Sequence, residues 1–257
     1  MREANPLFNL ENKVALITGG SRGIGKAITV ALARSGADVA VMSRNEKDGE
    51  EVTKDISEYG VNGIYVQGDV ALKDDIERTV SKVIDSFGKI DILVNNAAIC
   101  RNVEAEKMSW SDWHDVIHVN LSSVFLMCQT VGRKMIEKGH GSIINISSIS
   151  GEIVNIPQPQ CSYNVSKAGL SHLTKSLAVE WAKYGIRVNA IAPGYTETDM
   201  TRPALSTEWG KVWQDMTPFK RMGQPDEISG IAVYLASDNS SYTTGAVFNI
   251  DGAYTAL

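Results

Sequence analysis

The chain is predicted to fold as one α/β domain in which helices cover both faces of a parallel sheet. Short apolar segments alternate with longer helical segments along the sequence, a pattern typical of parallel strands joined by right-handed crossovers. The apolar segments leave little room for polar alternation, so we expect strands that are buried on both faces. No linker, repeat or low-complexity tract divides the 257 residues, so a single domain is expected over 1–257.

The order of the elements follows from the apolar runs and their stop signals. The first strand is expected at 13–18, where an apolar run ends at a glycine cluster, and a helix at about 26–35 stops at Gly36. Further strands are expected at 38–42, 63–67, 91–94, 142–146, 187–191 and 246–250. Further helices are expected at about 46–59, 73–87, 109–138, 163–184 and 226–237, with a break near Asn120 in the third of these.

One segment, 193–225, does not follow the alternation. It holds four of the seven prolines, together with Trp209, Trp213 and Met216. It is either a surface loop with a helix packed on the sheet edge, or a lid that brings apolar surface over a substrate. We favour the lid, because mobile segments near a site often close over it.

Composition argues against several classes of protein. A hydrophobic content of 43% and a charged content of 21% are ordinary for a soluble globular protein, and a net charge of −5 argues against a nucleic-acid partner. No apolar run approaches the ~18 residues that a membrane crossing needs, and 1–10 lacks the apolar core of a signal peptide. Cys100, Cys128 and Cys161 are odd in number and widely spaced, which indicates free thiols and a cytoplasmic location.

A phosphate-binding turn is predicted where the first strand meets the first helix. Gly19, Gly23 and Gly25 stand at this junction, with a spacing that differs from the G-x-G-x-x-G fingerprint of the standard dinucleotide fold. Glycine permits the turn and lets a diphosphate approach the unpaired N–H groups of the helix start. The same glycines could form a purely structural turn, but their place after the first buried strand favours an anion site.

The end of the second strand indicates the kind of dinucleotide. A coenzyme without a 2′-phosphate is usually held there by an acidic residue, about ~20 residues after the glycines. Here Ser43 and Arg44 occupy that place, and no carboxylate follows until Glu46. Arg44 and Arg22 can bind a phosphate through charge-assisted contacts, so NADP(H) is favoured over NAD(H). The alternative is that both arginines are solvated surface charges.

A tyrosine and a lysine form the candidate catalytic pair. Tyr163 and Lys167 are four residues apart, so on a helix they share one face. A cation within about 4–6 Å is expected to lower the phenol pKa by roughly 1–3 units from ~10, which suits proton exchange with an alcohol oxygen. Alone the pattern could belong to a solvated helix; a strand-like run ending in hydroxyls at 142–148 and the glycine turn favour the catalytic interpretation.

These features together resemble the classical short-chain dehydrogenase/reductase family. The resemblance rests on five marks in order: TGGSRGIG at 18–25, NNAA at 95–98, Ser148 ahead of Gly151, Tyr163-x-x-x-Lys167, and Pro193-Gly194. It extends from about Leu10 to the end of the chain. Ser147 and Ser150 stand close to Ser148, whose assignment depends on its distance from Gly151.

The resemblance implies a Rossmann-like domain with a seven-stranded parallel sheet, a cofactor half at about 10–150, a catalytic half at about 140–257 and a homotetrameric assembly. The implied catalytic residues are Asn120, Ser148, Tyr163 and Lys167. The implied cofactor-binding residues are Gly19, Ser21, Arg22, Gly23, Ile24, Ser43, Arg44, Asp69, Val70, Asn95, Tyr163, Lys167, Pro193, Gly194, Thr196 and Thr198. Asp69 would lie by the adenine, Thr198 by the nicotinamide amide, and Asn120 would hold a water that links Lys167 to solvent.

The segment 154–160 suggests a small-molecule substrate class. It looks like the version found in polyol dehydrogenases and ketose reductases, and its amides are expected to hydrogen-bond several substrate hydroxyls. Alternatively, Pro157 and Pro159 only rigidify a loop. A 3-oxoacyl thioester reductase on the same scaffold and a non-catalytic NADP(H) sensor are the alternative functions. His114 and His118 have the i, i+4 spacing of a zinc clasp, but no third ligand is evident, so no metal is expected.

Overall fold

The computed structural model, which describes residues 8–257, contains one parallel sheet with the strand order β3-β2-β1-β4-β5-β6-β7. The strands are β1 (Val14–Thr18), β2 (Asp38–Ser43), β3 (Gly63–Gln67), β4 (Ile92–Asn95), β5 (Gly141–Ile146), β6 (Ile186–Pro193) and β7 (Val247–Ile250). The helices are α1 (Gly23–Arg34), α2 (Glu46–Ser57), α3 (Lys73–Phe87), α4 (Trp110–Ile117), α5 (Ser123–Lys138), α6 (Cys161–Trp181), α7 (Glu208–Met216) and α8 (Pro225–Ala236). The predicted α/β fold with seven parallel strands is therefore confirmed.

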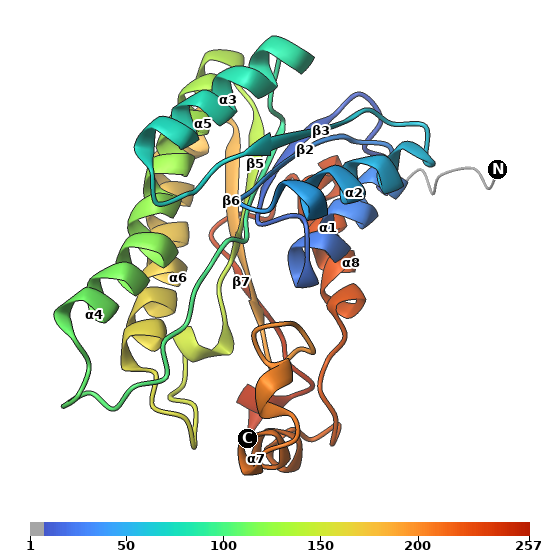
Figure 1. Ribbon diagram of the computed structural model, residues 1–257. Coiled ribbons are helices and arrows are strands. Elements are labelled where there is room, and N and C mark those ends of the chain that lie inside the picture. Colours follow the sequence, from blue (N-terminus) through green and yellow to red (C-terminus); the bar gives the residue numbers. More distant parts are fainter. Residues whose placement is uncertain (1–7) are drawn as a thin grey trace.

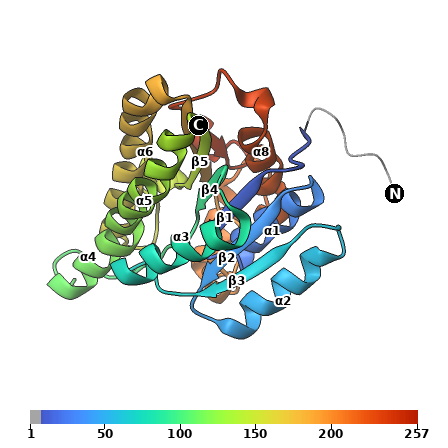
Figure 2. The same cartoon turned by 90° about the horizontal axis from the view of Figure 1, so that it is seen from above.

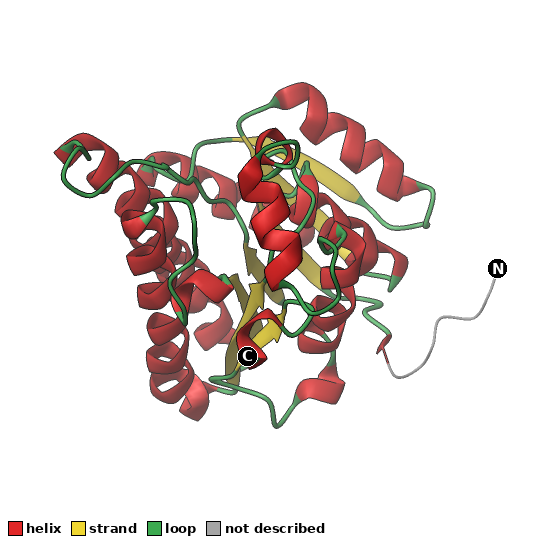
Figure 3. Ribbon diagram, turned by 90° about the horizontal axis from the view of Figure 1, so that it is seen from below, coloured by secondary structure: helices red, strands yellow, loops and turns green. Residues whose placement is uncertain are grey.

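Helices cover both faces of the sheet. Helices α1, α2 and α8 lie on one face, and α3, α4, α5 and α6 lie on the other (Figures 1 and 2). Neighbouring residues of β1 point into different cores: Ile17 packs with the first group of helices, and Leu16 packs with the second. The view coloured by secondary structure shows the strands enclosed between the two helical layers (Figure 3). Strands buried on both faces explain the continuous apolar runs in the sequence.

Two helix starts and one break differ in detail from the sequence-based expectations. Helix α1 begins at Gly23 rather than near Lys26, because the glycine turn itself supplies the first helical residues. The expected break near Asn120 is a π-helical turn, His118–Ser122, which separates α4 from α5. Helix α6 begins at Cys161, so Tyr163 lies within its first turn. The prediction that 1–10 lacks a signal-peptide core falls largely outside the described residues.

The topology gathers distant parts of the chain at one edge of the sheet. All seven strands are parallel, so their carboxyl ends meet at the same edge. In the register of the sheet, Thr18 at the end of β1 lies opposite Met42 of β2 on one side and Asn95 of β4 on the other. The strand order reverses direction between β1 and β4, and ligands of open α/β sheets bind at such a switch point. Among residues 8–257, no helix has both the length and the hydropathy needed to cross a membrane.

A buried carboxylate holds the opposite edge of the sheet together. Asp91 is 4% exposed, and it accepts hydrogen bonds from Lys138 Nζ at 2.8 Å and from the backbone N–H of Val14 at 2.8 Å. Lys89 Nζ lies 3.0 Å from the same carboxylate, and His140 Nε2 lies 3.4 Å from it. Burial alone would raise the pKa of Asp91, but the hydrogen bonds from Lys138, Lys89 and the Val14 N–H hold that pKa below its ordinary value.

We predict that Asp91→Asn lowers the free energy of unfolding at pH 7 by about 1.5–3 kcal/mol, the usual worth of hydrogen bonds to a charged group. The pKa of Asp91 in the folded protein lies below its value of ~3.9 in the unfolded chain. The stabilisation by ionised Asp91 is therefore fully present above pH ~3.9 and is lost as the pH falls through the folded-state pKa. Urea unfolding at pH 7 and at pH 3 would therefore show the difference between the two proteins shrinking at pH 3. Asp85→Asn, at an exposed position of α3, is the matched control, and an equal effect of both substitutions would contradict the prediction.

Candidate active site

The candidate pair lies at the carboxyl edge of the sheet, where α6 passes the end of β5. Lys167 is 2% exposed, and its Nζ donates a hydrogen bond of 2.7 Å to the carbonyl oxygen of Ile146, the last residue of β5. The same Nζ lies 5.6 Å from the centre of the Tyr163 ring. The two side chains therefore share one face of α6 and one region of the molecule, as their spacing predicts.

The predicted direction of the Tyr163 pKa is wrong for this structure. Burial raises the pKa of the Tyr163 phenol above its ordinary value, and Cys100 and Tyr195 raise it further. A hydrogen bond with Ser148 acts in the opposite direction but does not prevail. Burial also lowers the pKa of Lys167 to about 8, which weakens the cation that was expected to stabilise a phenolate. Desolvation exceeds the attraction between the two groups, so the phenol is protonated and can donate its proton.

The three neighbouring serines occupy different surroundings. Ser148 is close enough to Tyr163 to act on the pKa of its phenol, which it lowers, and its Oγ donates to Ser150 Oγ at 3.0 Å. Ser147 points the other way, into the packing of α6, where its Oγ donates to the carbonyl oxygen of Lys167 at 3.1 Å. Of the three, Ser148 is thus the one that the structure brings to the phenol, in agreement with the choice made from its distance to Gly151.

Asn120 is buried beside this group but does not point at Tyr163. Its Nδ2 donates to the carbonyl oxygen of Ile99 at 2.9 Å and to Ser166 Oγ at 3.0 Å, and its Oδ1 accepts from the Ile99 N–H at 2.9 Å. The side chain thereby fastens the loop after β4 to α6. Both amide hydrogens are engaged, so the predicted water link to Lys167 could use only the remaining lone pair of Oδ1 or the backbone of the π-helical turn.

The glycine turn has the geometry of an anion cradle. Gly19 has φ +64°, and a Cβ there would lie 2.9 Å from Asn96 Nδ2; a Cβ at Gly25 would overlap the carbonyl oxygen of Gly19. At the start of α1, Arg22 makes no side-chain cap, and the first turn holds no acidic residue. The unpaired N–H groups and the helix dipole therefore suit a negatively charged ligand. Because glycine has no Cβ, a dinucleotide diphosphate could approach these N–H groups closely.

The two candidate phosphate-binding arginines are exposed and weakly paired. Arg44 lies 3.8 Å from the carboxylate of Asp69, and Arg22 lies 3.9 Å from that of Asp199. Exposed ion pairs at such distances contribute little, so both guanidinium groups are available for a stronger anion. Ser43 is the last residue of β2, and its Oγ is turned to the carbonyl oxygen of Asn45.

The other predicted cofactor residues lie around the same edge but differ in what their side chains do. The Thr198 methyl group lies beside Gly23, and Pro193 ends β6 opposite Ile250 of β7. Thr196 Oγ1 donates to the carbonyl oxygen of Gly194 at 3.2 Å. Ser21 is buried within the turn, while Ile24 and Val70 pack partly against the two hydrophobic cores.

Asn95 turns its side chain away from this edge. Its Nδ2 donates to Asn145 Oδ1 at 2.9 Å and contacts Cys128 Sγ at 3.2 Å, within a buried polar cluster. The next residue, Asn96, supports the glycine turn instead, because its Nδ2 donates to the carbonyl oxygens of Thr18 and Gly19 at 3.1 and 2.9 Å. Asn96 belongs to the NNAA run at 95–98, but its role in supporting the glycine turn was not predicted from the sequence.

The amides of 154–160 are not directed at a ligand. Asn155 is 4% exposed, and Gln158 and Gln160 are 5% and 8% exposed, and all three are hydrogen-bonded to protein side chains. The expectation that these amides bind substrate hydroxyls directly is therefore wrong for this structure. Asn155 and Gln158 instead donate to the phenol oxygen of Tyr195, a residue that the sequence did not single out. Gln160 donates to Ser150 Oγ, Asn155 Oδ1 and Asn164 Oδ1.

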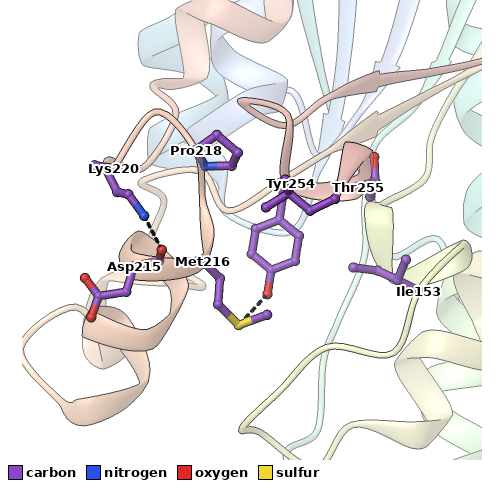
Figure 4. A pocket seen from close by; sticks show the side chains of 8 residues that line it. Ile153, Asp215, Met216, Pro218, Lys220, Tyr254 and Thr255 are labelled. Atoms are coloured by element: carbon purple, nitrogen blue, oxygen red, sulfur yellow. Dashed lines mark hydrogen bonds between the residues drawn. The ribbon is translucent and has the colours of Figure 1, made fainter.

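A cavity of about 420 Å³ opens beside Tyr254, between α7 and the end of the chain (Figure 4). Tyr254 Oη donates to Met216 Sδ at 3.3 Å, and its ring meets the Tyr195 ring edge-on with the centres 5.5 Å apart. The lining combines apolar residues with few polar groups: Ile153, Asp215, Met216, Pro218, Lys220, Tyr254, Thr255 and Leu257. Elsewhere, His118 Nε2 contacts the Ala71 carbonyl oxygen at 2.9 Å, and residues 8–257 contain no cluster of three or more metal-ligating side chains.

Comparisons with known proteins agree with this geometry. The family model described as enoyl-(acyl carrier protein) reductase matches residues 19–255. A sorbose reductase of Candida albicans is 41% identical over 97% of this chain and 89% of its own length, and an NADP-dependent mannitol dehydrogenase of Hypocrea jecorina is 42% identical over 97% and 94%. A crystal structure of a gluconate 5-dehydrogenase from Burkholderia cenocepacia in complex with NADP and tartrate has a TM-score of 0.92 and 36% identity, covering 98% of this chain and 100% of that one.

The match to the family model extends over nearly the whole chain, and the relatives are well above 30% identical over almost their full length. This confirms the resemblance inferred from the five sequence marks. The chain belongs to the short-chain dehydrogenase/reductase family.

Proposed function

We propose that the protein is an NADP(H)-dependent oxidoreductase that interconverts a secondary alcohol and a ketone, with a sugar alcohol and its ketose as substrates. The observation that supports this proposal is a buried phenol, Tyr163, whose ring centre lies 5.6 Å from Lys167 Nζ and whose pKa is raised by burial, at the edge that also holds the glycine turn. Relatives named as sorbose reductase, mannitol dehydrogenase and arabinitol 2-dehydrogenase support the polyol substrate class.

The side chains at this edge can perform the proton transfer that such a reaction needs. When bound, NADP(H) supplies or accepts the hydride at its nicotinamide ring. Tyr163, kept protonated by burial, donates its proton to the carbonyl oxygen in the reductive direction and takes it back in the oxidative direction. Ser148 hydrogen-bonds the same oxygen and the phenol, which orients both.

Lys167 and Asn120 act behind the phenol. The pKa of Lys167, near 8, allows the amine to gain or lose a proton close to neutral pH, so it can resupply the proton that Tyr163 gives up. Contact with ribose hydroxyls of a bound coenzyme would add hydrogen-bond partners to its single bond with Ile146. Asn120 fixes the loop after β4 against α6, and we assign to it the water that connects Lys167 with solvent.

The coenzyme would be held by groups from every strand end around the switch point. The glycine turn and the start of α1 would bind the diphosphate, and Arg22 and Arg44 the 2′-phosphate. Asp69 and Val70 would lie by the adenine, and Thr196 and Thr198 by the nicotinamide amide. Residues 10–150 would then form the cofactor half and 140–257 the catalytic half, with 193–225 as the lid.

We also infer a homotetramer in the cytoplasm. Helices α5 and α6 present exposed apolar side chains, including Phe125, Val165 and Val179, on the outer face of the molecule. Light scattering should give a mass of four times 27.9 kDa, and a monomer in solution would contradict the assembly.

A reductase of 3-oxoacyl thioesters is the second candidate, favoured by the description of the family model as enoyl-(acyl carrier protein) reductase. Acyl carriers are acidic and dock on basic patches, whereas this chain carries a net charge of −5. Assays of acetoacetyl thioesters beside fructose, sorbose and xylulose, each with NADPH, separate the two candidates. Turnover confined to the thioesters would overturn the polyol proposal.

We predict that Tyr163→Phe lowers kcat by about 10²–10⁴-fold, the usual contribution of a positioned general acid. The ring and its packing remain, so the dissociation constant of NADPH, measured by its fluorescence, should be preserved. Tyr184→Phe, at a half-exposed position after α6, is the matched control and should leave kcat unchanged. Full activity of Tyr163→Phe would refute the role of this phenol.

We predict that Arg44→Asp lowers the ratio of kcat/KM values for NADPH and NADH by roughly 10- to 100-fold, because a charge-assisted contact with the 2′-phosphate is replaced by repulsion. Lys47→Asp, three residues further on and equally exposed, makes the same change in net charge and serves as the control. Equal ratios in the wild-type protein and Arg44→Asp would show that Arg44 does not bind the phosphate.

A further inference from the structure

One buried side chain joins the segment before α6 to the segment after β6. Gln158 Oε1 accepts a hydrogen bond of 2.9 Å from the indole N–H of Trp213, and Gln158 Nε2 donates to Tyr195 Oη at 2.8 Å. Trp213 belongs to α7, and Tyr195 follows β6 directly. Gln158 and Trp213 are each 5% exposed, so water does not replace these contacts. A single amide thus joins the start of the lid segment 193–225 to the helix α7 that lies within it.

The chemistry of the partners fixes how this amide is oriented. An indole N–H can only donate, so the amide oxygen must face Trp213 and the amide nitrogen must face Tyr195. Asn155 Nδ2 donates to the same phenol oxygen at 3.0 Å. The Tyr195 ring also stacks on the Trp213 ring, with the centres 4.4 Å apart and the planes inclined by 11°. Tyr195 is therefore held by two amides on its oxygen and by an aromatic ring on its face.

Tyr195 lies near the reacting group. A chain of hydrogen bonds connects Tyr195 with Ser148. Asn155, whose Nδ2 donates to Tyr195 Oη, accepts on its Oδ1 from Gln160 Nε2 at 3.3 Å. Gln160 Nε2 also donates at 3.2 Å to Ser150 Oγ, which accepts from Ser148 Oγ at 3.0 Å. Cys100 follows β4, and its Sγ lies 3.9 Å from Gln160 Oε1. The segment that carries Ser148 is consequently joined through Gln160 and Asn155 to Tyr195, and Tyr195 is stacked on Trp213 of α7. The position of Tyr195 and α7 is the part of this arrangement that depends on Gln158.

Helix α7 has few other buried anchors. Trp213 and Gly210 are its buried residues, and Lys211 faces outward. Met216, at the end of α7, is 37% exposed and contacts the protein through its Sδ, which accepts a hydrogen bond from Tyr254 Oη. Trp213 also receives a hydrogen bond on its carbonyl oxygen from Thr217 Oγ1 at 2.7 Å, but that bond lies within the segment itself. Loss of the Gln158 amide would leave the indole N–H buried and unpaired, which favours a conformation in which α7 separates from the site.

We propose that Gln158 is a positioning residue that holds Tyr195 and α7 as the wall of the site against which the carbon chain of a polyhydroxy substrate is bound. The bridge is a property of the fold, whereas the substrate class in this statement rests on the proposed function. Gln158 does not touch the substrate; it determines whether Tyr195 is in place to do so. It should therefore affect substrate binding far more than the chemical step.

The test compares three variants of the full-length protein. Gln158→Met keeps the size of the side chain but removes both hydrogen bonds, and Trp213→Phe removes the indole N–H but keeps a ring for stacking. Gln214→Met, the same substitution on α7 at a position whose side chain makes no hydrogen bond among residues 8–257, is the matched control. Amide hydrogen exchange over 208–216 reports the attachment of α7 without any assay of activity.

We expect exchange over 208–216 to accelerate about tenfold or more in Gln158→Met and Trp213→Phe, and to be unchanged in Gln214→Met. The KM for the best ketose among fructose, sorbose and xylulose should rise by roughly tenfold in the same two variants, with kcat and the dissociation constant of NADPH nearly preserved. The double variant Gln158→Met/Trp213→Phe should be no more affected than Gln158→Met alone, because the bond that Trp213→Phe removes is one of the two that Gln158→Met already removes.

Unchanged exchange over 208–216 in both single variants would overturn the inference, whatever the substrate proves to be. Faster exchange without a rise in the KM of an active enzyme would also overturn it, since Gln158 would then be structural only. Faster exchange in a protein that turns over no ketose would support the bridge and contradict the proposed function. The two proposals can therefore fail separately.

Discussion

The burial of Lys167 against the end of β5 is the constraint on which the site depends. An ammonium with one hydrogen bond to a backbone carbonyl, at Ile146, is poorly solvated, and its pKa falls to about 8. The same exclusion of water keeps the Tyr163 phenol protonated. The phenol is thus a neutral proton donor, the pKa of the amine lies near 8, and neither group is held in a fixed charged state by a strong partner. Desolvation, rather than a close ion pair, sets the chemistry.

The parallel sheet makes this arrangement possible. The carboxyl ends of the strands meet at one edge, so residues far apart in the chain, from Gly19 after β1 to Tyr195 after β6, converge without long connections. Covering both faces with helices leaves the edge as the open approach to the core. Helix α6 runs past the end of β5, which gives Lys167 and Tyr163 their common orientation.

The local sequence pattern predicts the helices and strands well, but it predicts contacts between distant segments of the chain much less well. The continuous apolar runs predicted the buried strands, and the interrupted helical pattern near Asn120 predicted the break that is a π-helical turn. The spacing of four residues on a helix predicted that Tyr163 and Lys167 lie on the same face. The direction of the Tyr163 pKa could not be predicted, because it depends on how much water the folded surroundings exclude. The partners of Gln158 lie 37 and 55 residues away in the chain, so the amide looked equally suited to a ligand and to the protein.

The two edges of the sheet differ in how completely their polar groups are paired. At the amino edge, Asp91 is surrounded by cationic side chains and a backbone N–H, so its charge stabilises the fold. At the carboxyl edge, the start of α1 has no side-chain cap. Arg22 and Arg44 lie 3.9 and 3.8 Å from their carboxylate partners, and Lys167 Nζ donates one hydrogen bond, to the carbonyl oxygen of Ile146. Such incompletely paired groups lower stability in the free protein, and each gains a partner when an anionic coenzyme with ribose hydroxyls binds. Ligand binding should for this reason stabilise the carboxyl edge more than the amino edge.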